Sequence, residues 1–166
     1  MYRIINIKSI LLTFVALWFF AHGFKILGYL YNIEMAKEVR AGTFEVTGKR
    51  FSANELVTYS IFPFYAYHIG YLVGFIACIL LSNRKKADVI EAFIVLILFI
   101  FISYFGLTGW NNYLKHILLT PGAYLDGIGY FLVNGILMLL IGICFLILKK
   151  KVLLSRRNSQ LNEHYA

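Results

Sequence analysis

A histidine and a lysine one helical turn apart are the residues of this chain best suited to chemistry. His22 and Lys25 stand at positions i and i+3 of an apolar segment, so a helix places both side chains on one face. An imidazole titrates near neutral pH, and an ammonium group brings a positive charge. Such a pair is suited to binding an anionic or carbonyl oxygen, or to passing protons to a quinone-like ring.

Polar side chains in three further apolar segments fall at a similar depth. With a rise of about 1.5 Å per residue, they lie roughly 20–24 Å from the cytoplasmic ends of their helices. Ionisable groups within a membrane span are costly, which makes them functional candidates. We therefore expect a polar layer in the outer leaflet. No catalytic residue is assigned, and the candidate ligand-binding residues are His22, Lys25, His68, Tyr71, Ser103, Tyr104 and Asn134.

A purely structural interpretation of these residues stays open. Lys25 can extend toward the membrane surface, and the two histidines can hydrogen-bond to a facing helix. Asn134 can pack beside Gly135. The two cysteines, Cys78 and Cys144, have no C-x-x-C spacing and are expected to serve in packing rather than in thiol–disulfide exchange.

The elements that must position these residues are membrane-spanning helices. Of the 166 residues 60% are hydrophobic and only 14% are charged, which excludes a soluble or disordered chain. Four apolar runs are long enough to cross a hydrocarbon core of about 30 Å. They cover residues 10–30, 59–81, 89–107 and 123–148. We predict an all-α polytopic membrane protein, a four-helix bundle over residues 1–154, with a disordered tail over 155–166.

The positive charges orient this bundle. The formal charge is +8, and the excess lies beside the chain ends and in the turn after the second run, at Arg3, Lys8, Arg84, Lys85, Lys86, Lys149, Lys150, Lys151, Arg156 and Arg157. This distribution predicts that both termini are cytoplasmic, and it explains the basic excess without nucleic acid. Abundant Phe, Ile, Tyr, Lys and Asn are typical of an AT-rich bacterial genome, so we expect a multi-pass protein of a bacterial inner membrane, with the lipid bilayer as its surroundings.

The long first extracytoplasmic loop, residues 32–58, is expected to be structured. Residues 33–40 suit a short amphipathic helix, and 43–52 suit a small hairpin about a Thr47-Gly48 turn. Because an isolated hairpin is marginal, it is expected to lie on the membrane face or on a partner, and this loop is a candidate docking site for subunits of a membrane complex. Ser52-x-x-Glu55 matches a capping box that begins the next helix.

The two prolines predict helix boundaries. Pro63 is expected to kink or break the helix that follows the loop, before the true span. Thr120-Pro121 matches an N-cap followed by proline at the first helical position, which would open the fourth helix.

Signatures of metal and cofactor chemistry are missing from the sequence. No H-E-x-x-H, P-loop, G-x-S-x-G or haem-attachment pattern occurs, so no metal site is predicted. A haem between His22 and His68 is disfavoured, because their small and tyrosine neighbours offer no clear slot for a porphyrin. A quinone stays a candidate cofactor.

The segment Phe20-Ala21-His22-Gly23-Phe24-Lys25-Ile26-Leu27-Gly28 resembles the first-helix signature of the DoxX-like family, which carries H-G-x-x-K. Here the spacing is H-G-x-K, which moves the lysine by about 100° around the helix. The basic turn after the second run, Arg84-Lys85-Lys86, also resembles the family's layout. The resemblance implies a four-helix membrane protein that takes part in quinone-linked oxidoreduction or acts as an accessory subunit.

Three functions follow as expectations, and enzymatic activity stays open. In the first, the protein binds a quinone or another lipid-like molecule: His22 and Lys25 contact an oxygen, His68 accepts a proton, and Tyr71, Tyr104 and Asn134 orient the ring. In the second, it is a non-catalytic accessory subunit or assembly factor. The third, a sterol-isomerase-like enzyme, usually needs intramembrane carboxylates, whereas Asp88, Glu91 and Asp126 are expected at the span ends.

Overall fold

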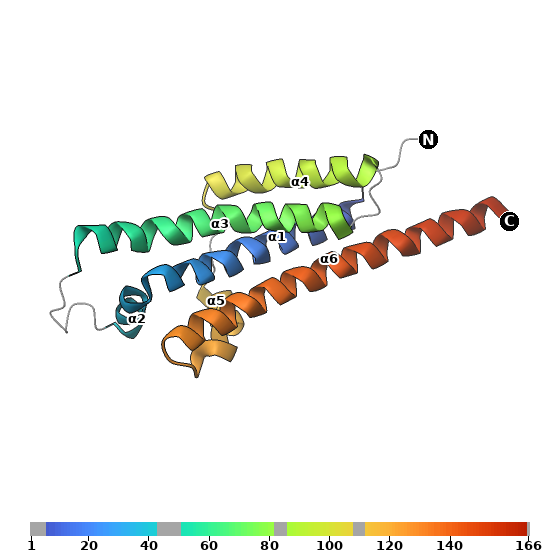
Figure 1. Cartoon of the computed structure of the whole chain (residues 1–166). Coiled ribbons are helices and arrows are strands. Elements are labelled where there is room, and N and C mark those ends of the chain that lie inside the picture. The colour runs from blue at the N-terminus through green and yellow to red at the C-terminus, as the bar shows by residue number, and fades with distance from the viewer. Residues whose placement is uncertain (1–5, 43–50, 82–85, 108–111, 166) are drawn as a thin grey trace. The chain divides into compact units, whose positions relative to one another are not determined.

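The structure, a computed structural model, describes residues 6–42, 51–81, 86–107 and 112–165, with side chains for 6–42, 51–81, 89–107 and 117–152. Figure 1 shows that the described residues form helices joined by turns, without a strand. The predicted all-α class is confirmed.

The described chain forms six α-helices and one short 3-10 helix. The first group is α1 (Ile7–Gly28), the 3-10 helix η1 (Tyr29–Asn32) and α2 (Ile33–Ala41). The others are α3 (Ala53–Leu81), α4 (Lys86–Tyr104), α5 (Asn112–Ala123) and α6 (Ile128–Tyr165). The helix expected over 33–40 is thus α2, which ends at Gly42 with a φ of 67°, a backbone conformation that glycine adopts without strain.

Three helical stretches in the described residues are long and apolar enough to cross a membrane. They are Ile7–Ala41, Ala53–Leu81 and Ile128–Val152, and Val89–Tyr104 is a shorter apolar helix. In the most apolar stretch of α3, only 17% is buried inside the protein. Since so many exposed aliphatic and aromatic side chains are unfavourable in water, lipid is the environment that suits them.

α3 begins at the predicted capping box and is not broken at Pro63. Its start follows the predicted capping box: the backbone N–H of Ser52 donates to Glu55 Oε2 at 2.7 Å, and that of Glu55 donates to Ser52 Oγ at 3.3 Å. The cap places the first helical residue at Ala53, six residues before the start of the predicted span at residue 59. Pro63 lies inside the helix, where its missing N–H removes one backbone hydrogen bond and the flanking turns continue.

The start of the last long helix also differs from the prediction. Pro121 lies inside α5, within a stretch that was expected to be a loop, instead of opening the fourth helix. A turn with Gly127 at a φ of 56° separates α5 from α6, so the last helix begins at Ile128 rather than 123. At its other end α6 continues to Tyr165 through the tail that was expected to be disordered. That tail contains no glycine or proline, and its Arg, Gln, Leu and Glu residues favour a helix.

The predicted hairpin over 43–52 lies almost entirely outside the described residues. Phe51 and Ser52 are described and are not helical. The basic turn after α3 is likewise outside the described side chains.

The chain divides into two compact units. Unit 1 consists of Met1–Phe19, Tyr71–Gly109 and Leu140–Ala166, and unit 2 of Phe20–Gly70 and Trp110–Leu139. Unit 1 therefore contains α4, unit 2 contains α2 and α5, and α1, α3 and α6 contribute residues to each.

Unit 1 has an aromatic and aliphatic core. Leu17, Val95 and Phe99 are completely buried. The ring of Phe14 meets that of Phe99 edge-on at a centroid distance of 5.3 Å, and the ring of Phe19 stacks on Phe145 at 5.6 Å. Dispersion between these rings therefore joins α1 to α4 and to α6.

In unit 2 the backbones of α1 and α3 approach each other closely. A Cβ atom added at Gly70 of α3 would lie 2.6 Å from the carbonyl oxygen of Phe20 on α1. Glycine is thus required at this contact between α1 and α3, as is common where membrane helices pack closely.

Candidate functional site

Unit 2 contains a cavity of about 560 Å³, within the size range of small-molecule sites. Every helical segment of the unit contributes to its wall. The lining residues are Lys25, Ile26, Tyr29, Ala36, Val39, Arg40, Tyr59, Leu119, Tyr130 and Phe131. Two of them are cations, three are tyrosines, none is acidic, and the others are apolar.

Lys25 lies in the last turn of α1 and is partly buried. No described residue forms a hydrogen bond or an ion pair with its ammonium group. An ammonium beside apolar walls keeps its charge at a cost unless an anion or a polar group meets it. The cavity therefore offers a positive charge that the described protein leaves uncompensated.

Arg40, in the last turn of α2, supplies the second cation of the cavity. Its Nη1 donates to the carbonyl oxygen of Leu125 at 3.0 Å, and its Nη2 to that of Ala123 at 3.2 Å. Since α5 ends at Ala123, the guanidinium satisfies carbonyls at a helix C-terminus, where a positive charge is favourable. These bonds use two of its five N–H donors.

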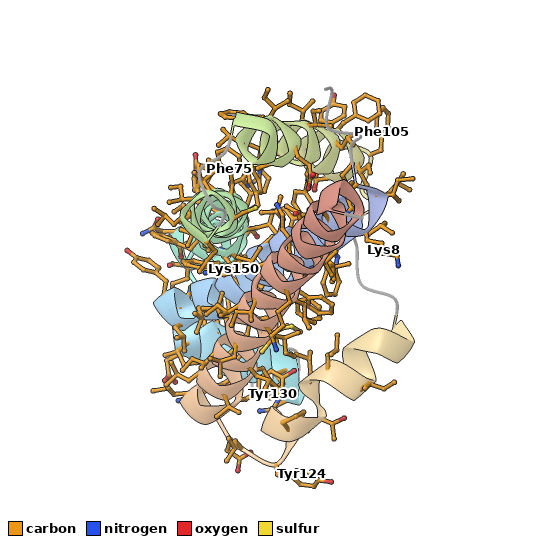
Figure 2. All side chains as sticks on the ribbon, turned by 90° about the vertical axis from the view of Figure 1, so that its right-hand side faces the viewer. Lys8, Phe75, Phe105, Tyr124, Tyr130 and Lys150 are labelled. Atoms are coloured by element: carbon orange, nitrogen blue, oxygen red, sulfur yellow. The ribbon has the colours of Figure 1, made fainter. Side chains whose placement is uncertain are left out.

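An aromatic wall holds this guanidinium in place. The Cζ atom of Arg40 lies 3.7 Å from the ring centroid of Tyr130, a labelled residue of α6 in Figure 2. The ring of Tyr29 lies 5.3 Å from that of Tyr59 and 5.9 Å from that of Phe131. The cavity thus combines fixed positive charge with phenol groups and a flat apolar surface.

Four of the seven predicted site residues belong to unit 2, but Lys25 is the one that lines the cavity. His22 is buried, and its ring meets Tyr67 edge-on at 5.4 Å. His68 Nδ1 lies 2.8 Å from the carbonyl oxygen of Phe64, one turn earlier on its own helix. His22 of α1 therefore contacts α3, and His68 contacts the preceding turn of its own helix.

Asn134 forms a contact between α5 and α6. It is completely buried, and its Oδ1 accepts a hydrogen bond of 3.2 Å from the backbone N–H of Gly122. Its Nδ2 has no hydrogen-bond partner among the described residues. A Cβ added at Gly122 would lie 2.4 Å from this Nδ2 atom, so the amide occupies the space that glycine leaves.

The other three predicted site residues belong to unit 1. Tyr71 is buried, with its ring 5.7 Å from that of Phe99. Ser103 is partly exposed near the end of α4, and Tyr104 is 86% exposed. The predicted set is thus divided between the two units.

A buried polar cluster in unit 1 was not predicted. It consists of one residue from each of four helices, Ser9 of α1, Cys78 of α3, Glu91 of α4 and Lys149 of α6. Lys149 Nζ lies 3.7 Å from Glu91 Oε1 and donates to Cys78 Sγ at 3.1 Å. The Ser9 hydroxyl donates to the same carboxylate oxygen of Glu91. We call this set the ion-pair cluster.

The arrangement of the ion-pair cluster suits a structural link. A buried charge is tolerated when it is paired and hydrogen-bonded, and both conditions are met here. The helical period carried a signal for it, because Glu91 shares a face of α4 with the buried Val95 and Phe99 at i+4 and i+8. The depth of Glu91 and Lys149 along their helices, at the expected span ends, does not indicate that the two side chains pair.

Neither metal-ligand geometry nor similarity to known proteins adds to the description of the site. Among the described residues, no group of three or more His, Cys, Asp and Glu side chains could hold a metal ion. Comparison of the chain with protein family models, with curated proteins and with solved structures gave no match.

Proposed function

We propose that this protein is a multi-pass membrane protein that binds a lipid-like small molecule, such as a quinone, in the cavity of unit 2. The observation that carries the proposal is the partly buried ammonium of Lys25, which has no partner among the described residues and lines a cavity of about 560 Å³. In this proposal α4 is a fourth span and both termini are cytoplasmic.

The cavity walls support an amphipathic ligand. Lys25 would contact an oxygen atom of the ligand, and the phenol groups of Tyr29 and Tyr59 can donate hydrogen bonds beside it. Ile26 and Phe131 provide apolar surface for a ring or a chain. A few polar groups among apolar side chains are typical of sites that orient a small molecule.

His22 has an indirect role in this proposal. It precedes Lys25 by one helical turn, but its buried ring packs against Tyr67 and does not line the cavity. We propose that His22 positions α1 against α3, so that Lys25 is held at the cavity. The DoxX-like resemblance and a redox role remain predictions that rest on this same helical turn.

The test is extraction of bound molecules from protein purified in a mild detergent. Lipids and quinones released by organic solvent are identified by mass spectrometry, for the unaltered protein and for Lys25→Gln. We expect a lipid-like molecule to accompany the unaltered protein in near-equal amount and to be lost from the variant. Lys37→Gln is the matched control, because Lys37 pairs with Glu34 at 3.1 Å and does not line the cavity.

Two outcomes would count against the proposal. One is that the purified protein carries no lipid-like molecule and takes up none when it is added. The other is that Lys25→Gln and Lys37→Gln retain the molecule equally. If in addition partner proteins copurify until residues 43–52 are deleted, the accessory-subunit function would take its place.

A further inference from the structure

We infer that the ligand of the unit 2 cavity is a lipid with a phosphate head group. The inference rests on the proposed function and names the chemical class of its ligand. It is drawn from the charges of the cavity, from the geometry of Arg40 and from the apolar part of the lining.

The charge of the cavity favours an anion over a neutral quinone. Lys25 and Arg40 contribute two positive charges, and no acidic residue lines the cavity. Among the described residues no carboxylate forms an ion pair with either cation. A neutral ring would leave the charge of the partly buried Lys25 uncompensated beside apolar walls, whereas an anion would be attracted both to Lys25 and to the exposed Arg40.

The geometry favours phosphate over a carboxylate. A phosphate monoester carries about −1.5 to −2 charges at neutral pH and presents three acceptor oxygens, so it can meet two cations at once. The guanidinium of Arg40 is fixed by two carbonyl oxygens and by the ring of Tyr130, and three of its N–H donors take no part in the carbonyl bonds. A planar guanidinium held in this way is well suited to phosphate oxygens.

The remaining lining favours a hydrocarbon chain on the phosphate. Ile26, Val39, Leu119 and Phe131 give the cavity an apolar side. Free phosphate would leave this side in contact with water, whereas an acyl chain would bury it. The cavity therefore matches the head group and the first part of the chain of an anionic membrane lipid.

Native mass spectrometry of the purified protein in detergent micelles tests this inference. The protein is titrated separately with dioleoyl phosphatidic acid, oleic acid, decylubiquinone and inorganic phosphate. We expect phosphatidic acid to bind with the highest affinity and one molecule per chain to saturate the site. Inorganic phosphate should bind far more weakly, because it buries no apolar surface.

Variants connect this binding to the two cations. Lys25→Gln should weaken binding of phosphatidic acid by about tenfold or more, the usual effect of a lost hydrogen bond to a charged group. Lys25→Arg keeps the charge and should retain most of the affinity. Arg40→Lys keeps the charge but loses the planar guanidinium held by two carbonyl oxygens and by the ring of Tyr130, so it should weaken binding. The control Lys37→Gln should bind as the unaltered protein does, since its ammonium pairs with Glu34 outside the cavity.

The outcomes separate this inference from the proposed function. If decylubiquinone or oleic acid binds as tightly as phosphatidic acid, and Lys25→Gln weakens that binding, the lipid site stands and the phosphate class is wrong. If inorganic phosphate binds as tightly as the lipid, the site is a phosphate site without a chain. If none of the four probes binds, the inference and the proposed function both fail. The comparison of probes in the unaltered protein does not depend on the folding of any variant.

Discussion

Replacing Lys149 by methionine should destabilise unit 1 strongly, because it leaves the carboxylate of Glu91 without its cation. Both side chains are nearly inaccessible, with side-chain exposures of 3% for Lys149 and 10% for Glu91. Methionine is unbranched like lysine and only one atom shorter, so the change removes the charge with little change in volume. The single variant thus tests the ion pair itself.

The expected magnitude follows from the separation of the two charges. At 3.7 Å, and with an effective dielectric constant of about 20, opposite unit charges attract by about 4.5 kcal/mol. Measured losses after removal of one partner of a buried pair are about 3–5 kcal/mol. We therefore expect Lys149→Met to lower the free energy of unfolding by about 3–5 kcal/mol.

Unfolding by sodium dodecyl sulfate in mixed micelles, followed by circular dichroism, measures this change. Lys150→Met is the matched control, because Lys150 is the next residue of α6 and is exposed. Its effect should stay within about 0.5 kcal/mol. The double variant Glu91→Gln/Lys149→Met should recover much of the loss, because no unpaired charge remains.

Two results would refute this reasoning. Equal effects of Lys149→Met and Lys150→Met would mean that the buried pair contributes no more than an exposed lysine. Strictly additive effects of the Glu91 and Lys149 substitutions would mean that the two charges do not interact.

Three further predictions use the same unfolding assay. Gly70→Ala should cost about 1–3 kcal/mol, because its new Cβ would meet the Phe20 carbonyl oxygen at 2.6 Å; an unchanged midpoint would contradict this contact. Gly122→Ala should be destabilising, and adding Asn134→Ala should restore part of the stability, since the clash is with the Asn134 amide; a further loss would argue against that clash. Ser52→Ala should cost about 1 kcal/mol through loss of the helix cap, and no change would show that the cap does not stabilise α3.

The parts of the fold that local sequence determines were predictable. Long apolar runs predicted the helices, and Ser52-x-x-Glu55 predicted the cap that begins α3. A break at Pro63 is not found because one missing hydrogen bond does not end a helix, and the predicted start at Pro121 was wrong because α5 begins before this proline. α5 was missed because its twelve residues are too few to resemble a membrane span.

The candidate site was predictable only in part. Lys25 was found because a cation within an apolar run stands out. Arg40 was not found, because acidic neighbours in the sequence balance its charge and its partner Leu125 is 85 residues away. The pairing of Glu91 with Lys149 was not found, because depth along a helix does not tell which way a side chain faces. That direction depends on the packing of other helices.

The guanidinium of Arg40 makes two kinds of contact at once. It holds the carbonyl oxygens at the α5–α6 turn and at the same time forms part of the cavity wall. A ligand that binds Arg40 in the proposed site would therefore be coupled to that turn, and by reciprocity the effect of the ligand on the turn would equal the effect of the turn on ligand binding. The rate at which a protease cuts beside the exposed Tyr124 would then change when a molecule binds to Arg40.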